Sequence, residues 1–433
     1  MKPVVIVGAG LSGLCCARTL AARGVAVEIL ERSDGVGGRV RTDEVDGFLL
    51  DRGFQILLTG YPELSRHLDL EALDLRQFDP GARLWTGRGF ERIGDPLRDP
   101  GSLVPSLLAR SGTLLDKWKV LGLRRDAVRG SDYGAFERAD GTTLELLRER
   151  GFSEQFIERF FRPFLGGIFL EPRLETTSRF FQFVFRMLAT GGNAVPALGM
   201  EEIPRQLVAG LPQGTVSVER EVVEVGADFV RLADGSRRDA SAVVVACEAP
   251  AARALLPELE VPAGRAVTCF YFDAPSSPAS TPILHLDATG EGPVNNAHVV
   301  SSLSERVAPA GRSLVSATVL GGDPDLPSLE AAVREQLGRW FGQPVTSWRS
   351  LRQYVIKHAI PAQPVGSLEP PRRPARTREG VFVCGDHRDQ ASIDGAMASG
   401  RRVAEGVAEH VARSREGGPH ASSSADIGGL PSA

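Results

Sequence analysis

VVIVGAGLSG, residues 4–13, decides the fold of this 433-residue chain. Four apolar residues end at the first of three glycines, which leaves no room for a helix before Gly8. An apolar stretch with helical character follows over residues 14–22, and a second apolar strand over 25–30. This order of strand, glycine loop, helix and strand is typical of a dinucleotide-binding βαβ unit. The sequence therefore predicts an α/β fold built on a parallel sheet.

Each glycine of this loop has a physical role. Gly8 makes the tight turn, Gly10 lets the backbone approach a pyrophosphate, and Gly13 lets the helix pack closely on the strand. The amides and the positive dipole at the helix start then face the phosphates, so we assign Leu11 and Ser12 to the same site.

The residues after the second strand narrow the choice of nucleotide. Glu31 follows that strand directly, 18 residues beyond Gly13, where a carboxylate accepts a hydrogen bond from a ribose hydroxyl. It would repel a ribose 2′-phosphate, so FAD or NAD is favoured over NADP. Gly38 and Arg39 add a second flexible turn and a cation, and a guanidinium suits phosphate oxygens. The alternative is a βαβ unit without a ligand.

The stretch ERSDGVGGRVRT (residues 31–42) resembles the FAD-dependent superfamily of amine oxidases, phytoene desaturases and protoporphyrinogen oxidases. That family has an acid, often followed by arginine, and then a glycine pair and arginine at this spacing. The resemblance implies FAD and adds Arg32 to the site. The stretch DRGFQ (51–55) resembles the second flavin-contacting loop of the family, which implies contacts from Gly53, Phe54 and Gln55.

Two later stretches extend the resemblance. Residues 221–225, followed by the turn 233–235 and the strand 242–246, resemble the hairpin whose first strand lies along the adenine, which implies a contact from Val222. VFVCGDHRDQASIDGAMASGRRVAEGV (381–407) resembles the closing motif of the family, a strand, Gly385-Asp386 and a helix beginning near Asp394.

The closing motif also makes physical sense without the family. A carboxylate after an apolar strand lies at the edge of a sheet where ligands of open α/β folds bind, so Asp386 can accept from a ribityl hydroxyl. The following helix is rich in small residues and can approach a flat ring closely. Its free amides would favour negative charge on reduced flavin. We assign Gly385, Ile393 and Ala396 to this part of the site.

The order of the motifs predicts a discontinuous Rossmann-type FAD-binding domain (residues 1–75, 196–255 and 372–413). An α+β substrate-binding domain is interleaved with it (76–195 and 256–371), and a disordered tail follows (414–433). Length alone would suggest about three domains.

Composition narrows the class of protein. A hydrophobic share of 42% and a charged share of 24% are typical of a globular protein, and a net charge of −4 provides no field for nucleic acid. The five cysteines form no CxxC and no metal-like pairing with histidine, so we expect no metal site, small core cysteines and a reducing cytoplasm. Some family members tether flavin through a cysteine just before the closing helix. Ala391 and Ser392 occupy that neighbourhood here, so the resemblance implies noncovalent FAD.

Half of the 20 phenylalanines lie between Phe152 and Phe185. Their spacing predicts one helix over 156–165, interrupted at Pro163 and the glycine pair 166–167, and a second over 176–189. Most of these side chains fit a buried core, and the others suit the wall of a pocket for a flat or long hydrophobic substrate. Residues 114–129 form a basic amphipathic pattern, which fits either a solvated outer helix or peripheral contact with a membrane.

No catalytic acid or base is assigned. Tyr354 or Lys357 could orient water or substrate, and His298 and His387 have no assigned role. Hydride transfer to flavin N5 depends more on orientation than on a strong base. A second GxGxxG in a strand–helix setting is absent, so dioxygen or a quinone is the expected electron acceptor.

The first hypothesis is therefore dehydrogenation of a hydrophobic small molecule such as a polyene or tetrapyrrole. Amine oxidation is the next alternative. It is less favoured because Ser392 stands where amine oxidases have an aromatic cage residue. A polyene isomerase using reduced flavin without net oxidation, and an escort protein of the same fold, are the remaining alternatives. The intact glycines and Glu31 argue against the escort protein.

Overall fold

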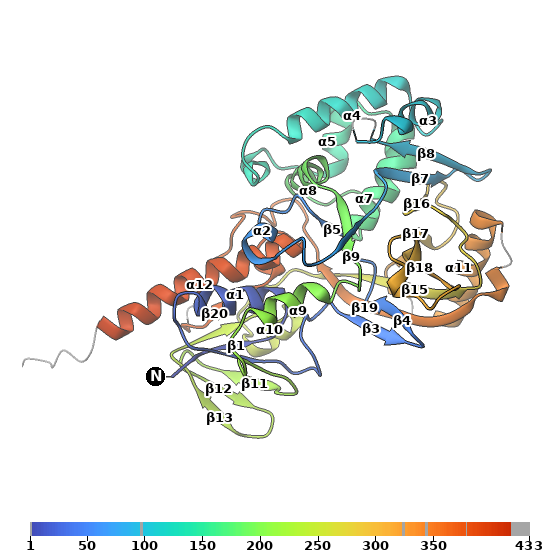
Figure 1. Cartoon of the computed structure of the whole chain (residues 1–433). Coiled ribbons are helices and arrows are strands. Elements are labelled where there is room, and N and C mark those ends of the chain that lie inside the picture. Colours follow the sequence, from blue (N-terminus) through green and yellow to red (C-terminus); the bar gives the residue numbers. More distant parts are fainter. Residues whose placement is uncertain (1, 96–97, 323–324, 343–344, 378, 417–433) are drawn as a thin grey trace, which may run out of the picture.

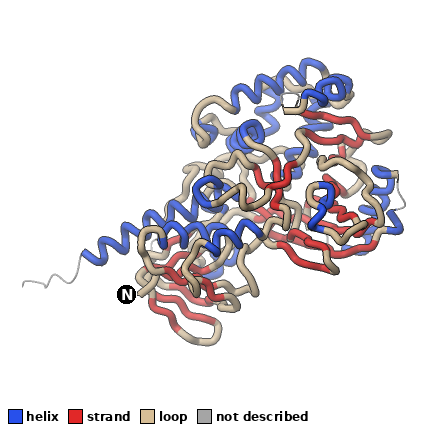
Figure 2. The backbone as a smooth tube through the Cα atoms, viewed as in Figure 1, coloured by secondary structure: helices blue, strands red, loops and turns tan. Residues whose placement is uncertain are grey.

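The computed structural model describes residues 2–95, 98–322, 325–342, 345–377 and 379–416. A parallel sheet with its helices lies at one end, and the helices around α4 (Leu114–Ala127) lie at the opposite end (Figure 1). Strands gather in the lower and middle parts, and the upper part is mainly helical (Figure 2).

The parallel sheet has the strand order β10-β2-β1-β14-β20. Its strands are β10 (Val216–Ser217), β2 (Val27–Leu30), β1 (Val4–Val7), β14 (Ala242–Val245) and β20 (Phe382–Val383). Both faces of the sheet are covered, which is why β1 and β14 are continuous apolar runs rather than alternating ones. Three sequence-distant parts of the chain therefore share one sheet.

Alternate residues of these strands belong to two different cores. Val4 and Ile6 pack with α1 (Leu11–Ala21), α9 (Glu202–Ala209) and α12 (Ile393–Glu416). Val5 and Val7 pack on the other side with α10 (Ala249–Leu255) and the antiparallel sheet β11-β12-β13. The strands of that sheet are β11 (Val222–Val225), β12 (Phe229–Leu232) and β13 (Arg237–Asp239).

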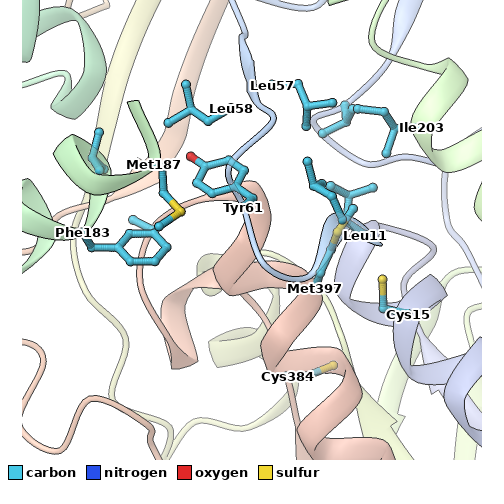
Figure 3. Packing of buried hydrophobic residues seen from close by; sticks show 14 of the residues in the cluster. Leu11, Cys15, Leu57, Leu58, Tyr61, Phe183, Met187, Ile203, Cys384 and Met397 are labelled. Atoms are coloured by element: carbon cyan, nitrogen blue, oxygen red, sulfur yellow. The ribbon is translucent and has the colours of Figure 1, made fainter. Parts of the chain in front are cut away.

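Helices α1 and α12 lie side by side on this sheet, although they come from opposite ends of the chain. A Cβ added at Gly400 would lie 2.1 Å from the Ser12 carbonyl oxygen, so the small residues of α12 allow this approach. Leu11, Met397 and Tyr61 belong to the same hydrophobic cluster (Figure 3).

The largest sheet is seven-stranded, with the order β19-β15-β18-β17-β16-β7-β8, and only its β16–β7 pair is parallel. Its strands are β19 (Arg349–Pro361), β15 (Gly264–Ala274), β18 (Ser313–Leu320), β17 (Val294–Val299), β16 (Leu284–Asp287), β7 (Gly81–Trp85) and β8 (Phe90–Gly94). Helix α11 (Leu326–Phe341) packs its apolar side on this sheet through Val333 and Leu337.

Two smaller sheets complete the strands: β3 (Thr42–Val45) with β4 (Phe48–Asp51), and β5 (Leu57–Leu58), β9 (Asn193–Pro196) and β6 (Leu75–Gln77) in that order. The remaining α-helices are α2 (Leu64–His67), α3 (Leu103–Leu108), α5 (Thr143–Glu149), α6 (Glu154–Phe156), α7 (Arg162–Phe169) and α8 (Ser178–Thr190).

The predicted α/β class is confirmed, and so are the first strand, α1, α8 and α12 to within a few residues. Three predictions are wrong. Residues 242–246 do not complete the hairpin, because β14 pairs in parallel with β1 and β20. Pro163 and the glycine pair do not interrupt the phenylalanine-rich helix, because a π-helical turn (Ile157–Phe161) leads into α7 and places the proline in its first turn. Residues 414–416 continue α12, and the rest of the predicted tail lies outside the described residues.

The cysteine prediction is confirmed for Cys15, Cys16 and Cys384, which are buried, whereas Cys247 is half-buried. Within the described ranges, no group of His, Cys, Asp or Glu is arranged to hold a metal ion. No helix of the described residues combines the length and apolar character that crossing a bilayer requires.

Candidate functional site

A cavity of about 750 Å³ opens at the carboxyl ends of the parallel strands. Gly8 after β1, Glu31 after β2, Ala246 after β14 and Gly385 after β20 all line it. This is the edge at which open α/β sheets bind ligands, and the volume is in the range of ligand pockets, about 300–1,000 Å³. The sheet thus brings both ends of the chain to one cavity.

Sixteen of the seventeen residues assigned to the site line this cavity. They are Gly8, Gly10, Leu11, Ser12, Glu31, Arg32, Gly38, Arg39, Gly53, Phe54, Gln55, Val222, Gly385, Asp386, Ile393 and Ala396. The seventeenth, Gly13, lies behind the loop, where an added Cβ would be 2.1 Å from the Gly8 carbonyl oxygen. Its role is therefore close packing of helix on strand rather than contact with a ligand.

The glycine loop leaves the start of α1 open to the cavity. Gly8 has a φ of +109°, which favours glycine, and an added Cβ at Gly10 would meet no atom within 4 Å. Gly10 is the N-cap of α1 and has no side chain to satisfy the first amides of the helix. Gly38 lies against it, since an added Cβ there would be 3.5 Å from the Gly10 Cα. Such an uncapped helix start offers free amides that suit an anion.

Glu31 is buried and its carboxylate braces the glycine loop. One oxygen accepts from the Ala9 amide at 2.7 Å, and the other accepts from the amide and hydroxyl of Ser33 at 2.9 and 2.8 Å. The carboxylate still lines the cavity and keeps acceptor capacity for a hydroxyl. Arg32 extends outward and lies 3.6 Å from Glu248.

Arg39 joins three segments that are far apart in the sequence. Its Nη2 donates to the Asp386 carboxylate at 2.7 Å, and its Nη1 donates to the Ala359 carbonyl at 2.7 Å. The sequence placed this cation beside a pyrophosphate; the structure shows its guanidinium bound to the closing motif and to β19. Asp386 is buried, so the ion pair holds the two ends of the chain together across the cavity.

The second loop is held against the first. Gln55 donates from its side-chain amide to the carbonyls of Arg39 and Arg52 at 2.8 and 3.3 Å. Gly53 has a φ of +94°, and an added Cβ would lie 2.5 Å from Ile356 Cδ1. Phe54 packs on His298, with ring centroids 4.9 Å apart.

The histidines and other polar candidates do not supply a base in the cavity. Burial lowers the pKa of His298 to about 3 and that of His387 to about 4, so both are neutral near neutral pH. Tyr354 donates its hydroxyl to Asp43 at 2.7 Å, and Lys357 is exposed. None of these four side chains lines the cavity.

The cavity is divided by charge. Its charged lining residues all lie outside α7, α8 and the seven-stranded sheet; they are Glu31, Arg32, Arg39, Arg41, Arg52, Arg220, Glu221, Glu248 and Asp386. The lining contributed by α7, α8, β16, β17, β18 and β19 carries no charged side chain among the described residues. This uncharged part includes Phe164, Ile168, Phe180, Val184 and Leu188 from the phenylalanine-rich helices.

A buried polar network supports the closing helix from behind. The Asp394 carboxylate accepts from the Glu63 amide, the Tyr133 hydroxyl and the Gln390 amide at 2.9, 3.0 and 2.9 Å. Burial nevertheless raises the pKa of Asp394 to about 6. Burial also opposes ionisation of Glu63, but the nearby His67 ring, 3.5 Å away, and the hydrogen bonds from Arg401 outweigh it and hold the pKa of Glu63 at about 2.

Sequence reasoning missed Tyr61, Asn296 and Thr318, which line the uncharged part of the cavity. Asn296 and Thr318 face each other across neighbouring strands, with the amide donating to the hydroxyl at 3.3 Å. Tyr61 follows a two-residue strand and had no motif to mark it. The strand alternation of β17 and β18 was the one signal that could have found the other two.

A family model described as "Flavin containing amine oxidoreductase" matches residues 11–408. Among curated relatives, chloroplastic protoporphyrinogen oxidase of Nicotiana tabacum is 29% identical over 44% of this chain and 33% of its own length. Putrescine oxidase of Kocuria rosea is 43% identical over 28% of this chain and 24% of its own length. The matched part thus spans about a third or less of these relatives.

Solved structures match along almost the whole chain. An oxidoreductase from Methanosarcina mazei has a TM-score of 0.72 at 19% identity, covering 93% of this chain and 100% of its own. Cyclohexylamine oxidase from Brevibacterium oxydans has a TM-score of 0.66 at 19% identity, covering 95% of this chain and 100% of its own. At this identity the likeness shows a shared fold.

Proposed function

This chain belongs to the flavin-containing amine oxidoreductase family, and we propose that it binds FAD noncovalently and removes two electrons from an uncharged hydrophobic small molecule. Dioxygen or a quinone then takes the electrons. The observation that carries this proposal is the division of one cavity into a charged part at the sheet edge and an uncharged part among α7, α8 and the seven-stranded sheet.

The chemistry of the charged part supports a dinucleotide. The uncapped start of α1 offers amides to a pyrophosphate, and Glu31 offers an acceptor to the ribose of the adenosine. Val222 would contact the adenine. Asp386 and the loop of Gly53 would hold the ribityl and ring end, where the start of α12 contributes Ile393 and Ala396.

A bound flavin supplies a two-electron acceptor that takes a hydride at N5. The residues of the chain orient the substrate and exclude water from it. The apolar side chains of α7 and α8 form the wall, and Asn296 and Thr318 offer an amide and a hydroxyl to a polar group of the substrate. No charged base in this part is required, because the reaction depends mainly on orientation.

The uncharged lining favours a neutral substrate over a cationic amine. Transferring an ammonium group into an apolar site without a carboxylate partner is costly. Two of the charged residues that line the cavity, Arg39 and Asp386, already satisfy each other at 2.7 Å. Ser392 also stands where an aromatic residue would form a cage for the amine. A polyene or a tetrapyrrole suits these conditions better.

The cofactor part is tested by the visible spectrum of the purified protein and by its release of FAD on denaturation. A colourless protein that takes up no FAD would contradict it and would revive the escort alternative. For the acceptor, the protein is photoreduced without oxygen and mixed with oxygen, a quinone or NAD(P)⁺. Fast reoxidation by NAD(P)⁺ alone would contradict the proposed acceptor. Under reducing anaerobic conditions, a product of unchanged mass would favour the isomerase alternative.

The substrate part is tested by placing a charge in the uncharged wall. Leu188→Glu is expected to keep the flavin spectrum and to lose turnover of neutral hydrophobic substrates, whereas Leu188→Met keeps both. If Leu188→Glu instead leaves turnover unchanged, the substrate does not contact α8. A panel of polyenes, porphyrinogens and amines assayed on the unaltered protein identifies the class. Turnover of amines alone would refute the neutral substrate.

A further inference from the structure

The helices α3 and α4 carry an apolar face that the rest of the described chain leaves uncovered. Among the residues that the structure describes, nine of the thirteen exposed large hydrophobic side chains lie between residues 103 and 128. We call this surface the α3–α4 face; it consists of Leu103, Val104, Leu107, Leu108, Leu114, Leu115, Trp118, Leu121 and Val128. Leu108 is 75% exposed and Trp118 is 70% exposed, so the surface meets solvent with its largest side chains. The two helices lie at the end of the molecule remote from the parallel sheet (Figure 1).

Helix α3 buries its polar side chains and exposes its apolar ones, which is the reverse of an ordinary surface helix. It buries Ser106, whose hydroxyl accepts from the Gly94 amide at 2.9 Å, and the preceding Ser102 is also buried. Its leucines and valine point outward instead. A surface helix in water normally places its apolar stripe toward the core. This inverted pattern indicates that the outer side of α3 has an apolar environment when the protein works.

Helix α4 continues the same surface. Leu114, Trp118 and Leu121 recur at helical spacing on its exposed side, and Leu115 lies beside them. Lys117 donates from Nζ to the carbonyls of Leu107 and Ala109 at 2.8 and 2.9 Å, which fixes the end of α3 against α4. The two helices therefore present one surface rather than two independent ones.

The charge of this segment is opposite to that of the chain. Residues 100–129 contain six basic and two acidic side chains, a net charge of +4, while the whole chain carries −4. One acid, Asp116, is buried and bound to Thr113 and Ser153. Arg125 and Arg129 share the other acid, Asp126, at 3.8 and 4.0 Å, and about two thirds of each arginine side chain stays exposed. Apolar side chains bordered by exposed arginines complement a layer that has an apolar interior and an anionic outer surface.

We propose that the α3–α4 face docks the protein on an anionic lipid surface, with the leucines and Trp118 inserted at the level of the headgroups. Tryptophan suits that level because one end of its ring is apolar and the other can hydrogen-bond. A second copy of this chain is a poorer occupant. A symmetric dimer through this face would bring together two copies of a segment whose net charge is +4, and like charges across an interface repel.

The test uses the full-length protein with its bound cofactor and vesicles of phosphatidylcholine, alone or with about one third phosphatidylglycerol. We expect co-sedimentation with the anionic vesicles at low salt, and a decrease as salt screens the arginines. Tryptophan emission shifts to the blue on binding through Trp118, the one exposed tryptophan of the four; Trp340 and Trp348 are buried and Trp85 is half-buried. The shift is therefore expected to disappear in Trp118→Phe. Absence of binding to anionic vesicles at all salt concentrations would overturn the proposal.

Two variants separate insertion from charge. Leu108→Glu combined with Trp118→Glu is expected to weaken vesicle binding by on the order of 100-fold, since two large side chains no longer insert. Arg125→Glu combined with Arg129→Glu is expected to weaken it by on the order of tenfold and to flatten its dependence on salt. The matched control is Val365→Glu, which changes an exposed apolar residue outside this face. It should bind as the unaltered protein does.

An unaltered flavin spectrum verifies that each variant is folded. Equal vesicle binding by the control and by both double variants would show that another surface is responsible, and would refute the proposal. Sedimentation velocity without lipid tests the competing occupant, a second copy of the chain. A dimer that disappears in the Leu108→Glu/Trp118→Glu variant, without vesicle binding by the unaltered protein, would assign the face to a second copy of the chain instead.

Discussion

Replacing Arg39 with methionine tests whether the two ends of the chain are held together across the cavity. The substitution keeps most of the length of the side chain but removes both hydrogen bonds, the one to the Asp386 carboxylate and the one to the Ala359 carbonyl. It leaves Asp386 as a buried carboxylate without its cation. We expect a less stable protein that binds FAD more weakly, because the segments that line the cavity are no longer joined by the hydrogen bonds of Arg39.

The magnitude follows from the burial of the pair. Breaking a fully buried ion pair costs about 3–5 kcal/mol, whereas an exposed one is worth about 0–1 kcal/mol. The Asp386 side chain is 9% exposed and that of Arg39 is 32% exposed, which lies between these limits. We therefore expect Arg39→Met to lower the free energy of unfolding of the FAD-free protein by about 2 kcal/mol. The same loss expressed at the cofactor would weaken FAD binding by roughly 30-fold.

The assay is urea unfolding of the apoprotein together with equilibrium titration with FAD, for Arg39→Met, Asp386→Asn and the double variant. The double variant should be more stable than the sum of the single losses predicts, by about 1 kcal/mol, because no charge is then orphaned. The matched control is Arg231→Met. Arg231 pairs with Glu224 at the same 2.7 Å, but both side chains are roughly half exposed. This control substitution should lower the free energy of unfolding by no more than about 0.5 kcal/mol. Additive losses in the cycle would refute the idea that the pair acts as one unit.

Three further variants probe other parts of the site. Gly53→Ala should weaken FAD binding, measured by equilibrium dialysis, because its Cβ would lie 2.5 Å from Ile356 at a φ of +94°. Arg401→Met should destabilise the protein in urea by about 2–3 kcal/mol, since the buried Glu63 carboxylate loses two bonds of 2.9 Å, and Arg401→Lys should not restore them. Asp394→Asn changes the pH dependence. The raised pKa of about 6 means that the protonated acid stabilises the fold at low pH and that this contribution is lost as pH rises from about 4 to 6. Thermal unfolding over that range should therefore show the unaltered protein losing stability relative to Asp394→Asn, and parallel curves would contradict the assignment.

The nucleotide-binding side was largely predictable from sequence because its geometry is local. Gly8, Gly10 and Glu31 lie within one βαβ unit, where spacing along the chain fixes spacing in space. Their positions at the cavity follow from the strands they succeed, because Gly8 directly follows β1 and Glu31 directly follows β2. The closing motif was predictable for the same reason, since Asp386 directly follows a buried strand and the helix after it begins at Ile393, as expected near Asp394.

The partners of these residues were not predictable. Arg39 pairs with a residue 347 positions away, and nothing in its own neighbourhood names that partner. The strand 242–246 was misassigned for a related reason. An apolar run of this length fits a hairpin and a parallel sheet equally well, and only its pairing with β1 decides between them. The phenylalanine-rich helix was read as broken because proline usually ends a helix, but a π-helical turn before Pro163 places it where no amide hydrogen bond is lost.

The order of segments along the chain explains why one cavity can have two chemistries. Six of the nine charged lining residues lie close to a strand end of the parallel sheet or of β11, where turns expose polar side chains to a ligand. Arg41 and Arg52 adjoin β3 and β4, and Arg39 lies in the second glycine turn. The uncharged lining comes from faces of helices and of the seven-stranded sheet, whose side chains would otherwise be core. Because the chain passes back and forth between these two parts, the boundary between charge and apolar surface falls at Arg39, Ala359 and Asp386. The Arg39–Asp386 ion pair is therefore also the point at which the charged lining gives way to an apolar wall.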